Sequence, residues 1–223
     1  MKFGVLFSGG KDSTLATWFA KKHCNDISCL ITIVSSNKNS YMFHTPSISK
    51  TKKQAEAMNI PLMVEKTKGG KESELKDLER AMKKAKAKYK IQGIVTGAVE
   101  SVYQASRIQK ICDNLGLECF NPLWHKDQFE LLEDLIKNKF QVIITGVAAY
   151  PLDGSWLGRV IDKKFIKDLK PLVEKYKINP AGEGGEFETF VLAAPGLFKK
   201  SLKVTDAKIS GEKNSWRMEI EVE

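Results

Sequence analysis

A glycine-rich stretch near the N-terminus carries the residue types that bind phosphate. An apolar segment that ends at Phe7 runs into a short loop, within which a helical pattern begins: Ser8-Gly9-Gly10-Lys11-Asp12-Ser13. The glycines let the backbone turn so that several N–H groups face inward, and the helix N-terminus adds unpaired donors and partial positive charge. The serine hydroxyls and the lysine ammonium add further donors. The glycine spacing differs from the GxxxxGK[ST] loop of kinases and GTPases, so the sequence predicts another kind of phosphate-binding loop.

Asp12 is an acid beside the predicted phosphate site, and two roles are open for it. Carboxylate and phosphate oxygens are preferred ligands of Mg²⁺, so Asp12 can bind the metal next to the phosphates. Asp12 can instead cap the helix that follows, since aspartate is a favoured N-cap residue. The first role makes Asp12 and Lys11 catalytic candidates, because preorganised charges near a leaving pyrophosphate lower the barrier.

The loop resembles the pyrophosphate loop, SGGxDS, of the ATP-pyrophosphatase superfamily. The resemblance implies that ATP is split into AMP and pyrophosphate, which leaves into the loop, with Mg²⁺ bound at Asp12. It also implies that the whole loop is the nucleotide site: Ser8, Gly9, Gly10, Lys11, Asp12 and Ser13. Ligands of parallel sheets lie at the carboxyl ends of the strands, so Ile33, near the end of the second strand, is expected close to the adenine.

Five further segments resemble one branch of that superfamily, the diphthine–ammonia ligases, and follow the order of that family. They are Tyr41 to His44, Gly97 to Gln104, Asn121 to Trp124, Asp153 to Arg159 and Gly182 to Phe190. This likeness implies that the carboxylate of diphthine, a modified histidine of translation elongation factor 2, is adenylated and then amidated by ammonia. ATP and Mg²⁺ are the implied cofactors, and the diphthine form of elongation factor 2 is the implied partner.

The same resemblance assigns side chains to the two halves of the site. At the nucleotide it adds three residues to the loop: Phe43, His44 and Gly97. At the acceptor it places nine: Glu100, Tyr103, Gln104, Trp156, Arg159, Glu183, Glu186, Glu188 and Thr189. Arg107 and Glu186 join Lys11 and Asp12 as the implied catalytic residues.

Several of these residues also have a purely structural explanation. Arg107 shares a helix face with Tyr103, and its planar guanidinium either binds a phosphate or carboxylate or is a surface group. Gln104 either lies at the acceptor or is only the capping partner of Ser101. His44 is either a base near the nucleotide or a histidine with a structural hydrogen bond.

The acidic glycine loop has two readings as well. The loop carries three carboxylates: Glu183, Glu186 and Glu188. They are either solvated, or they bind a cation, which is the quaternary ammonium of diphthine or ammonium. Aromatic faces such as that of Trp156 suit the same cation, although Trp156 and Arg159 can instead pack a domain interface. Glu100 lies at the end of a strand, where an acid can hold a metal or a cationic substrate.

The elements that must position these residues alternate along the first half of the chain. Apolar and β-branched runs predict strands over 2–7, 27–34, 60–65, 91–96 and 117–120. Patterns with a period of three to four residues predict helices over 12–23, 45–58, 73–89 and 101–115, with a cap at Thr45-Pro46 and a stop at Gly116. Alternation of this kind predicts an α/β fold with a doubly wound, parallel, five-stranded sheet. The resemblance of the loop implies that this sheet is similar to that of the adenine-nucleotide α-hydrolases.

The rhythm changes after about residue 125, and we expect two domains, 1–125 and 126–223. The second is expected to be a smaller α+β domain that binds the acceptor. Helices are predicted to begin at Asp127 and Asp162, the second kinked or split by Pro171. Strands are predicted over 141–145, 188–194, 202–210 and 216–222, with irregular segments over 150–159 and 180–188.

Composition restricts the partners and the compartment. The chain of 223 residues carries a formal charge of +9, which favours anionic partners, so nucleic acid is possible but not the primary partner. No apolar run is long enough to span a membrane and no signal peptide is evident, so a cytoplasmic protein without a membrane partner is expected. The sequence leaves open whether it forms an oligomer.

The cysteines separate competing functions. The chain has four cysteines: Cys24, Cys29, Cys112 and Cys119. None of them forms a CxxC pair, so we expect them to be small buried side chains and not ligands of a zinc ion. An accessible pair of thiols would instead favour a tRNA-modifying ligase or thiolase of the same superfamily. A non-catalytic nucleotide-binding module is the third possibility.

Overall fold

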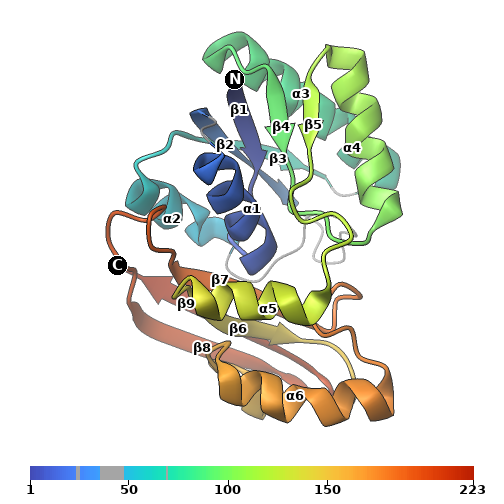
Figure 1. Cartoon of the computed structure of the whole chain (residues 1–223), viewed down its shortest axis with the longest axis vertical. Coiled ribbons are helices and arrows are strands. Elements are labelled where there is room, and N and C mark those ends of the chain that lie inside the picture. Colours follow the sequence, from blue (N-terminus) through green and yellow to red (C-terminus); the bar gives the residue numbers. More distant parts are fainter. Residues whose placement is uncertain (24–25, 36–47, 69) are drawn as a thin grey trace.

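The computed structural model describes residues 1–23, 26–35, 48–68 and 70–223 (Figure 1). It contains two sheets, each with its own helices. The first sheet lies in the upper part of Figure 1, and the second lies below it with α5 and α6. No helix in these ranges is long and apolar enough to cross a membrane.

The first sheet has five parallel strands in the order β3-β2-β1-β4-β5. They are β1 (Lys2–Leu6), β2 (Asp26–Ser35), β3 (Leu62–Thr67), β4 (Gly93–Val95) and β5 (Glu118–Phe120). The order reverses between β1 and β4, and the carboxyl ends of strands at such a reversal form the usual ligand crevice of α/β sheets. The predicted parallel, doubly wound sheet is confirmed.

Helices cover both faces of this sheet because alternate strand residues are apolar on both sides. The helices are α1 (Lys11–Lys22), α2 (Thr51–Met58), α3 (Lys71–Tyr89) and α4 (Val102–Leu115), with a short 3-10 turn, η1 (Ile48–Lys50). On β1, Phe3 and Val5 pack with α1 and α2. On β2, Ile31 and Ile33 pack with α3 and α4 in a separate buried cluster.

The second sheet is antiparallel, with the strand order β7-β6-β9-β8. Its strands are β6 (Gln141–Val147), β7 (Phe187–Ala193), β8 (Val204–Glu212) and β9 (Ser215–Val222). The helices are α5 (Gln128–Lys137) and α6 (Lys163–Tyr176), with a 3-10 turn, η2 (Gly154–Trp156), in the segment expected to be irregular. The predicted α+β character of this smaller part is confirmed.

One cluster of buried side chains runs across both parts. It joins Phe7 and Leu15 of the first part to Leu132 of α5 and Val191 of β7. The boundary expected at residue 125 falls between β5 and α5, but the two sheets share this core. The phosphate loop and the second sheet are therefore held in one packed unit.

Most helix starts agree with the sequence. Ser101, Asp127 and Asp162 are N-caps, and each side chain accepts a backbone N–H of the first turn. The alternative role of Asp12 as an N-cap is wrong, because Gly10 caps α1 and Asp12 lies in the first turn. The predicted cap at Thr45-Pro46 lies outside the described residues.

Pro171 does not divide α6, which runs unbroken from Lys163 to Tyr176. The expectation of a split helix is therefore wrong. Phe165 and Leu169 are buried before the proline, and Leu172 and Val173 pack against the same cluster after it. Burial of one continuous apolar face outweighs the single backbone hydrogen bond that proline removes.

Candidate active site

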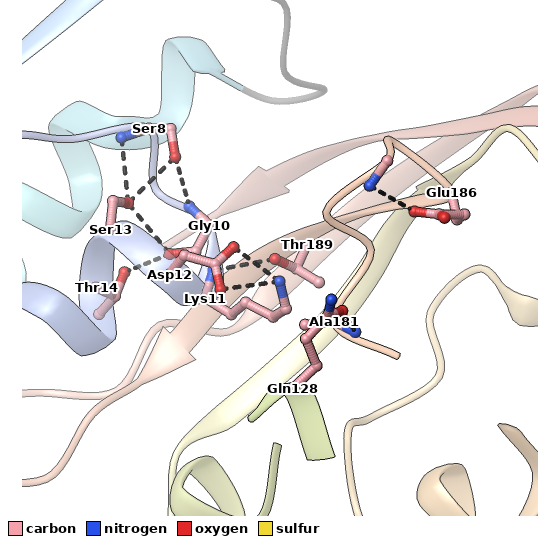
Figure 2. A network of polar contacts seen from close by, with 11 residues as sticks. Ser8, Gly10, Lys11, Asp12, Ser13, Thr14, Gln128, Ala181, Glu186 and Thr189 are labelled. Carbon is pink, nitrogen blue, oxygen red and sulfur yellow. Dashed lines mark hydrogen bonds and ion pairs between the residues drawn. The ribbon is translucent and has the colours of Figure 1, made fainter. Parts of the chain in front are cut away.

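The predicted loop leaves β1 and enters α1 in a tight turn. Gly9 has a φ of +83°, which favours glycine, and a Cβ there would also collide with the Gln54 side chain. The hydroxyls of Ser8 and Ser13 lie 3.1 Å apart, and Ser13 Oγ accepts the Ser8 N–H at 3.3 Å (Figure 2). These contacts hold the loop in a compact shape at the N-terminus of α1, where backbone donors gather.

The loop is attached to the free edge of β7, the outermost strand of the second sheet. The Val191 N–H donates to the Gly9 carbonyl at 3.2 Å. The Lys11 N–H donates to Thr189 Oγ1 at 3.0 Å, so Thr189, which was expected at the acceptor, contacts the phosphate loop (Figure 2). The buried Gln54 side chain donates to both the Gly9 and the Val191 carbonyls. Gln54 was not predicted, because a glutamine in a lysine-rich helix looks like a surface residue.

Lys11 and Asp12 form an ion pair inside this contact. Lys11 is only 3% exposed, and its Nζ lies 2.7 Å from Asp12 Oδ2 and 5.7 Å from the centre of the Phe187 ring. A buried ammonium needs an anionic partner, and Asp12 supplies it. Two of the four residues predicted to be catalytic, Lys11 and Asp12, thus lie where the loop contacts β7 of the second sheet.

Gly97 touches the loop from the end of β4. A Cβ at this position would lie 2.7 Å from both the carbonyl carbon of Asp12 and the nitrogen of Ser13. Such a contact is too close for any side chain, so only glycine lets β4 approach the start of α1. The predicted place of Gly97 beside the loop agrees with this packing.

Two acids of the glycine loop lie close to the Lys11–Asp12 pair. Burial, with the nearby Asp12 charge as the next cause, raises the pKa of Glu183 to about 7. Glu183 also accepts a hydrogen bond from the backbone of Glu100, which ties this loop to the end of β4. Burial raises the pKa of Glu188 to about 7 as well, although the Lys11 and Arg217 charges oppose that rise. Both carboxyls can therefore change charge near neutral pH.

A buried glutamine on α5 joins three of these segments. Gln128 donates to Glu100 Oε2 at 3.1 Å and to Asn179 Oδ1 at 3.4 Å, and its own Oε1 accepts the Ala181 N–H at 2.9 Å. The side chain is 8% exposed. Gln128 was not predicted, because only the fold brings its partners together.

Glu186 has a different role from its two neighbours in this structure. Its Oε1 accepts the backbone and side-chain N–H groups of Asn179 at 2.9 and 2.8 Å, and its Oε2 accepts the Gly184 N–H at 2.8 Å. Figure 2 shows it apart from Lys11. These bonds shape the acidic loop, and the structure does not bring the Glu186 carboxylate to the Lys11–Asp12 ion pair.

Both halves of the chain match models of one protein family. Residues 1–119 match the diphthamide synthase N-terminal domain and residues 127–222 match the diphthamide synthase C-terminal domain. The chain is 34% identical to a diphthine–ammonia ligase of Bos taurus and 32% identical to that of Homo sapiens, over 94% of this chain and 85% of each relative. The chain belongs to the diphthine–ammonia ligase family. The resemblance seen in its motifs is confirmed.

Other relatives differ in length. The diphthine–ammonia ligase of Schizosaccharomyces pombe is 32% identical over 94% of this chain, but the match covers only 37% of that protein. A solved structure, a predicted subunit of tRNA methyltransferase from Methanocaldococcus jannaschii, matches 89% of this chain and all of that one at 17% identity and a TM-score of 0.44.

Several residues that the family resemblance assigned to the site lie away from the Lys11–Asp12 ion pair. The Arg107 guanidinium stacks on the Tyr103 ring, 3.5 Å from its centre. The backbone N–H of Gln104 donates to the Ser101 hydroxyl, which caps α4. Arg159 stacks on Trp156 and bonds Asp168 at 2.6 Å. Ile33 is buried beneath α3, while Phe43 and His44 lie outside the described residues.

The described cysteines are not placed for sulfur chemistry at the loop. Cys29 and Cys112 are buried and Cys119 is half-buried, all three in or against the cluster beneath α3 and α4. Burial raises the pKa of Cys29 to about 12. A hydrogen bond between Cys112 and Cys119 raises the pKa of Cys112 and lowers that of Cys119. Cys29 and Cys112, which are buried and have raised pKa values, are poor nucleophiles, and Cys24 lies outside the described residues.

Proposed function

We propose that this protein is a ligase that activates the diphthine carboxylate of elongation factor 2 with ATP and then amidates it with ammonia. The observation that carries the proposal is the meeting of two parts at Lys11: a phosphate-type loop from the first sheet and the acidic loop of the second. A ligase of this kind needs ATP and a cationic acceptor side by side, and family membership supports the same reaction.

ATP fits the loop on chemical grounds. The N-terminus of α1, the two serine hydroxyls and the Lys11 ammonium offer donors to the pyrophosphate that leaves as AMP is transferred. In the described ranges, no three His, Cys, Asp or Glu side chains come together as a metal cage. Mg²⁺ is commonly held by one or two carboxylates and the substrate phosphates, so Asp12 suits it. When bound, Mg²⁺ would neutralise phosphate charge at the loop.

Glu183 and Glu188 suit the second half of the reaction. Their pKa values of about 7 let each carboxyl accept or release a proton near neutral pH. One ionised carboxylate takes a proton from ammonium, and the ammonia formed attacks the carbonyl carbon of the adenylated diphthine. The new C–N bond forms as the bond to AMP breaks, AMP leaves with the electron pair of that bond, and the second carboxylate takes the proton that the attacking nitrogen loses. Glu100 and Gln128 position the acidic loop through their hydrogen bonds.

The remaining assignments are part of the same proposal. Phe43 and His44 contact the nucleotide and Arg107 acts at the reacting groups, whereas Ile33 supports the end of β2 from the core and Glu186 shapes the acidic loop. Tyr103, Gln104, Trp156, Arg159 and Thr189 complete the acceptor side. The protein works where elongation factor 2 works, in the cytoplasm.

The test is a pyrophosphate-release assay with ATP, Mg²⁺, ammonium and elongation factor 2 that carries diphthine, followed by mass spectrometry of that factor. We expect release that depends on the factor, together with conversion of the carboxylate to an amide. Lys11→Ala and Asp12→Asn should abolish release in protein that circular dichroism shows to be folded, and Lys200→Ala, at an exposed position, should not. Activity in either loop variant would disprove the assignment of the loop.

A further inference from the structure

The last strand of the second sheet, β8, is open to solvent along its whole length. The strand order β7-β6-β9-β8 gives it β9 on one side and, among the residues that the structure describes, no strand on the other. Every residue of β8 is exposed. An edge strand presents a row of backbone N–H and C=O groups, and a strand of another chain can pair with such a row.

One face of β8 continues a buried apolar cluster outward. Three apolar residues of β8 lie opposite three residues of β9: Val204 opposite Val222, Ala207 opposite Ile220, and Ile209 opposite Met218. The three β9 side chains are at most 6% exposed, whereas Val204 and Ile209 are 39% and 54% exposed. The cluster therefore reaches β9 and leaves the apolar row of β8 uncovered, as at a surface that binds another protein.

The backbone of Ala207 points to the free edge. Its N–H donates to Asp206 Oδ1 at 2.9 Å. The pairing of the β8–β9 hairpin agrees, because Glu212 and Ser215 flank a two-residue turn and form its first pair. Residues that bond the neighbouring strand alternate with residues that point away from it, so every second residue back from Glu212 faces β9 and Ala207 does not. A further strand can bond Ala207 without breaking the β8–β9 ladder.

The charges of β8 are complementary to those of β8 in a second copy. In an antiparallel pair of β8 strands with a two-fold axis at Ala207, Asp206 of each copy lies opposite Lys208 of the other. These are non-hydrogen-bonded positions, where opposite side chains come closest. Within one chain Asp206 lies opposite Glu221, which is paired with Lys50. Lys208 of the second copy gives Asp206 a cation of its own.

We propose that two copies of this chain form a dimer through β8, by antiparallel pairing of β8 with β8 about Ala207. A second copy fits this surface because one short segment supplies the apolar row, the outward backbone groups and both members of a reciprocal ion pair. The two sheets then form one sheet in the order β7-β6-β9-β8-β8-β9-β6-β7. The β7 strands, which contact the phosphate loops, lie at its two outer edges, so each copy keeps its own site and the dimer does not depend on the proposed function.

Sedimentation equilibrium of the whole chain at micromolar concentration tests the charge pairing. The wild type should have the mass of two chains. Asp206→Lys and Lys208→Asp each place like charges opposite one another twice, so each should raise the Kd of the dimer about 10-fold or more, and the two changes together should restore it. The matched control is Lys164→Asp, the same change at an exposed position of α6, which should leave the dimer intact. A wild type with the mass of one chain, or a double variant no tighter than either single variant, would overturn the proposal.

Two variants at Ala207 test the backbone register. Ala207→Pro removes only the outward N–H, so the protein should be folded by circular dichroism and monomeric in the centrifuge. Ala207→Cys places two thiols at the axis, where the Cα atoms of a hydrogen-bonded pair lie about 5.5 Å apart, within the span of a disulfide. Diamide should therefore link two Ala207→Cys chains on a non-reducing gel, and it should not link Ser210→Cys chains, whose thiols lie far from the axis. A dimeric Ala207→Pro, or equal cross-linking of the two cysteine variants, would show that another surface joins the copies.

Discussion

Replacing Glu188 by glutamine should make the protein more stable at alkaline pH. In the folded protein the pKa of this carboxyl is about 7, whereas its ordinary value is 4.5. The folded state therefore binds the proton more tightly than the unfolded state. The stabilisation is fully present below pH 4.5 and is lost as the pH rises through 7.

The size of this effect follows from the two pKa values. Their difference of about 2.5 corresponds to about 3 kcal/mol, and partial contact with solvent reduces it to about 2 kcal/mol. Glutamine has nearly the same shape and no charge to bury, so Glu188→Gln removes the loss. At pH 8.5 the free energy of unfolding should exceed that of the wild type by about 2 kcal/mol, and at pH 4.5 the two should agree.

Urea unfolding between pH 4.5 and 8.5 measures this difference directly. The matched control is Glu219→Gln, which changes an exposed glutamate of β9 in the same sheet. It should follow the wild type at every pH. If the stability of Glu188→Gln falls with pH in parallel with the wild type, Glu188 is not desolvated in the folded protein, and its assignment as a neutral-pH acid is wrong.

Two further variants probe the contact between loop and sheets. Gly97→Ala places a methyl group 2.7 Å from the Asp12–Ser13 peptide, so we expect the KM for ATP to rise at least about 10-fold, with Gly70→Ala as a control in pyrophosphate-release assays. An unchanged KM for ATP would show that β4 shifts to make room for the methyl group while the phosphate loop stays in place, which would contradict this prediction. Thr189→Val removes the acceptor of the buried Lys11 N–H, which should cost about 1–3 kcal/mol of stability. If a phosphate oxygen of ATP takes that N–H, ATP should raise the melting temperature of Thr189→Val more than that of the wild type, and an equal rise would contradict this role.

The parts of the site that could be predicted from sequence are those built by neighbours in the chain. The loop over residues 8–13 combines glycines, hydroxyls and a helix start within a few residues, so its local chemistry is readable. Gly97 and Thr189 were named from family motifs, but their contacts with Ser13 and Lys11 depend on the meeting of distant segments.

Other residues carried no local signal. Gln54 lies between lysines and alanines on α2, and Gln128 opens a helix that looks amphipathic, yet both side chains are buried by partners far along the chain. Arg217 and Trp216 occupy a strand that alternates charged and apolar residues, which indicates one buried face but not which polar side chains come close to other segments. Hydrophobic periodicity gives the type of each element, but it does not specify which polar side chains its neighbours will cover.

The core that runs across both sheets also affects how the chain folds during synthesis. The ribosome makes β1 to β5 first, but Phe7 and Leu15 are covered in part by Leu132 and Val191, which emerge later. Until then the growing chain exposes that apolar surface, and the Gly9 carbonyl lacks the Val191 N–H that it accepts. The nascent first half therefore exposes an apolar surface of the kind that chaperones bind. A nucleotide site that is finished only when β7 arrives cannot bind ATP productively before the acceptor site exists.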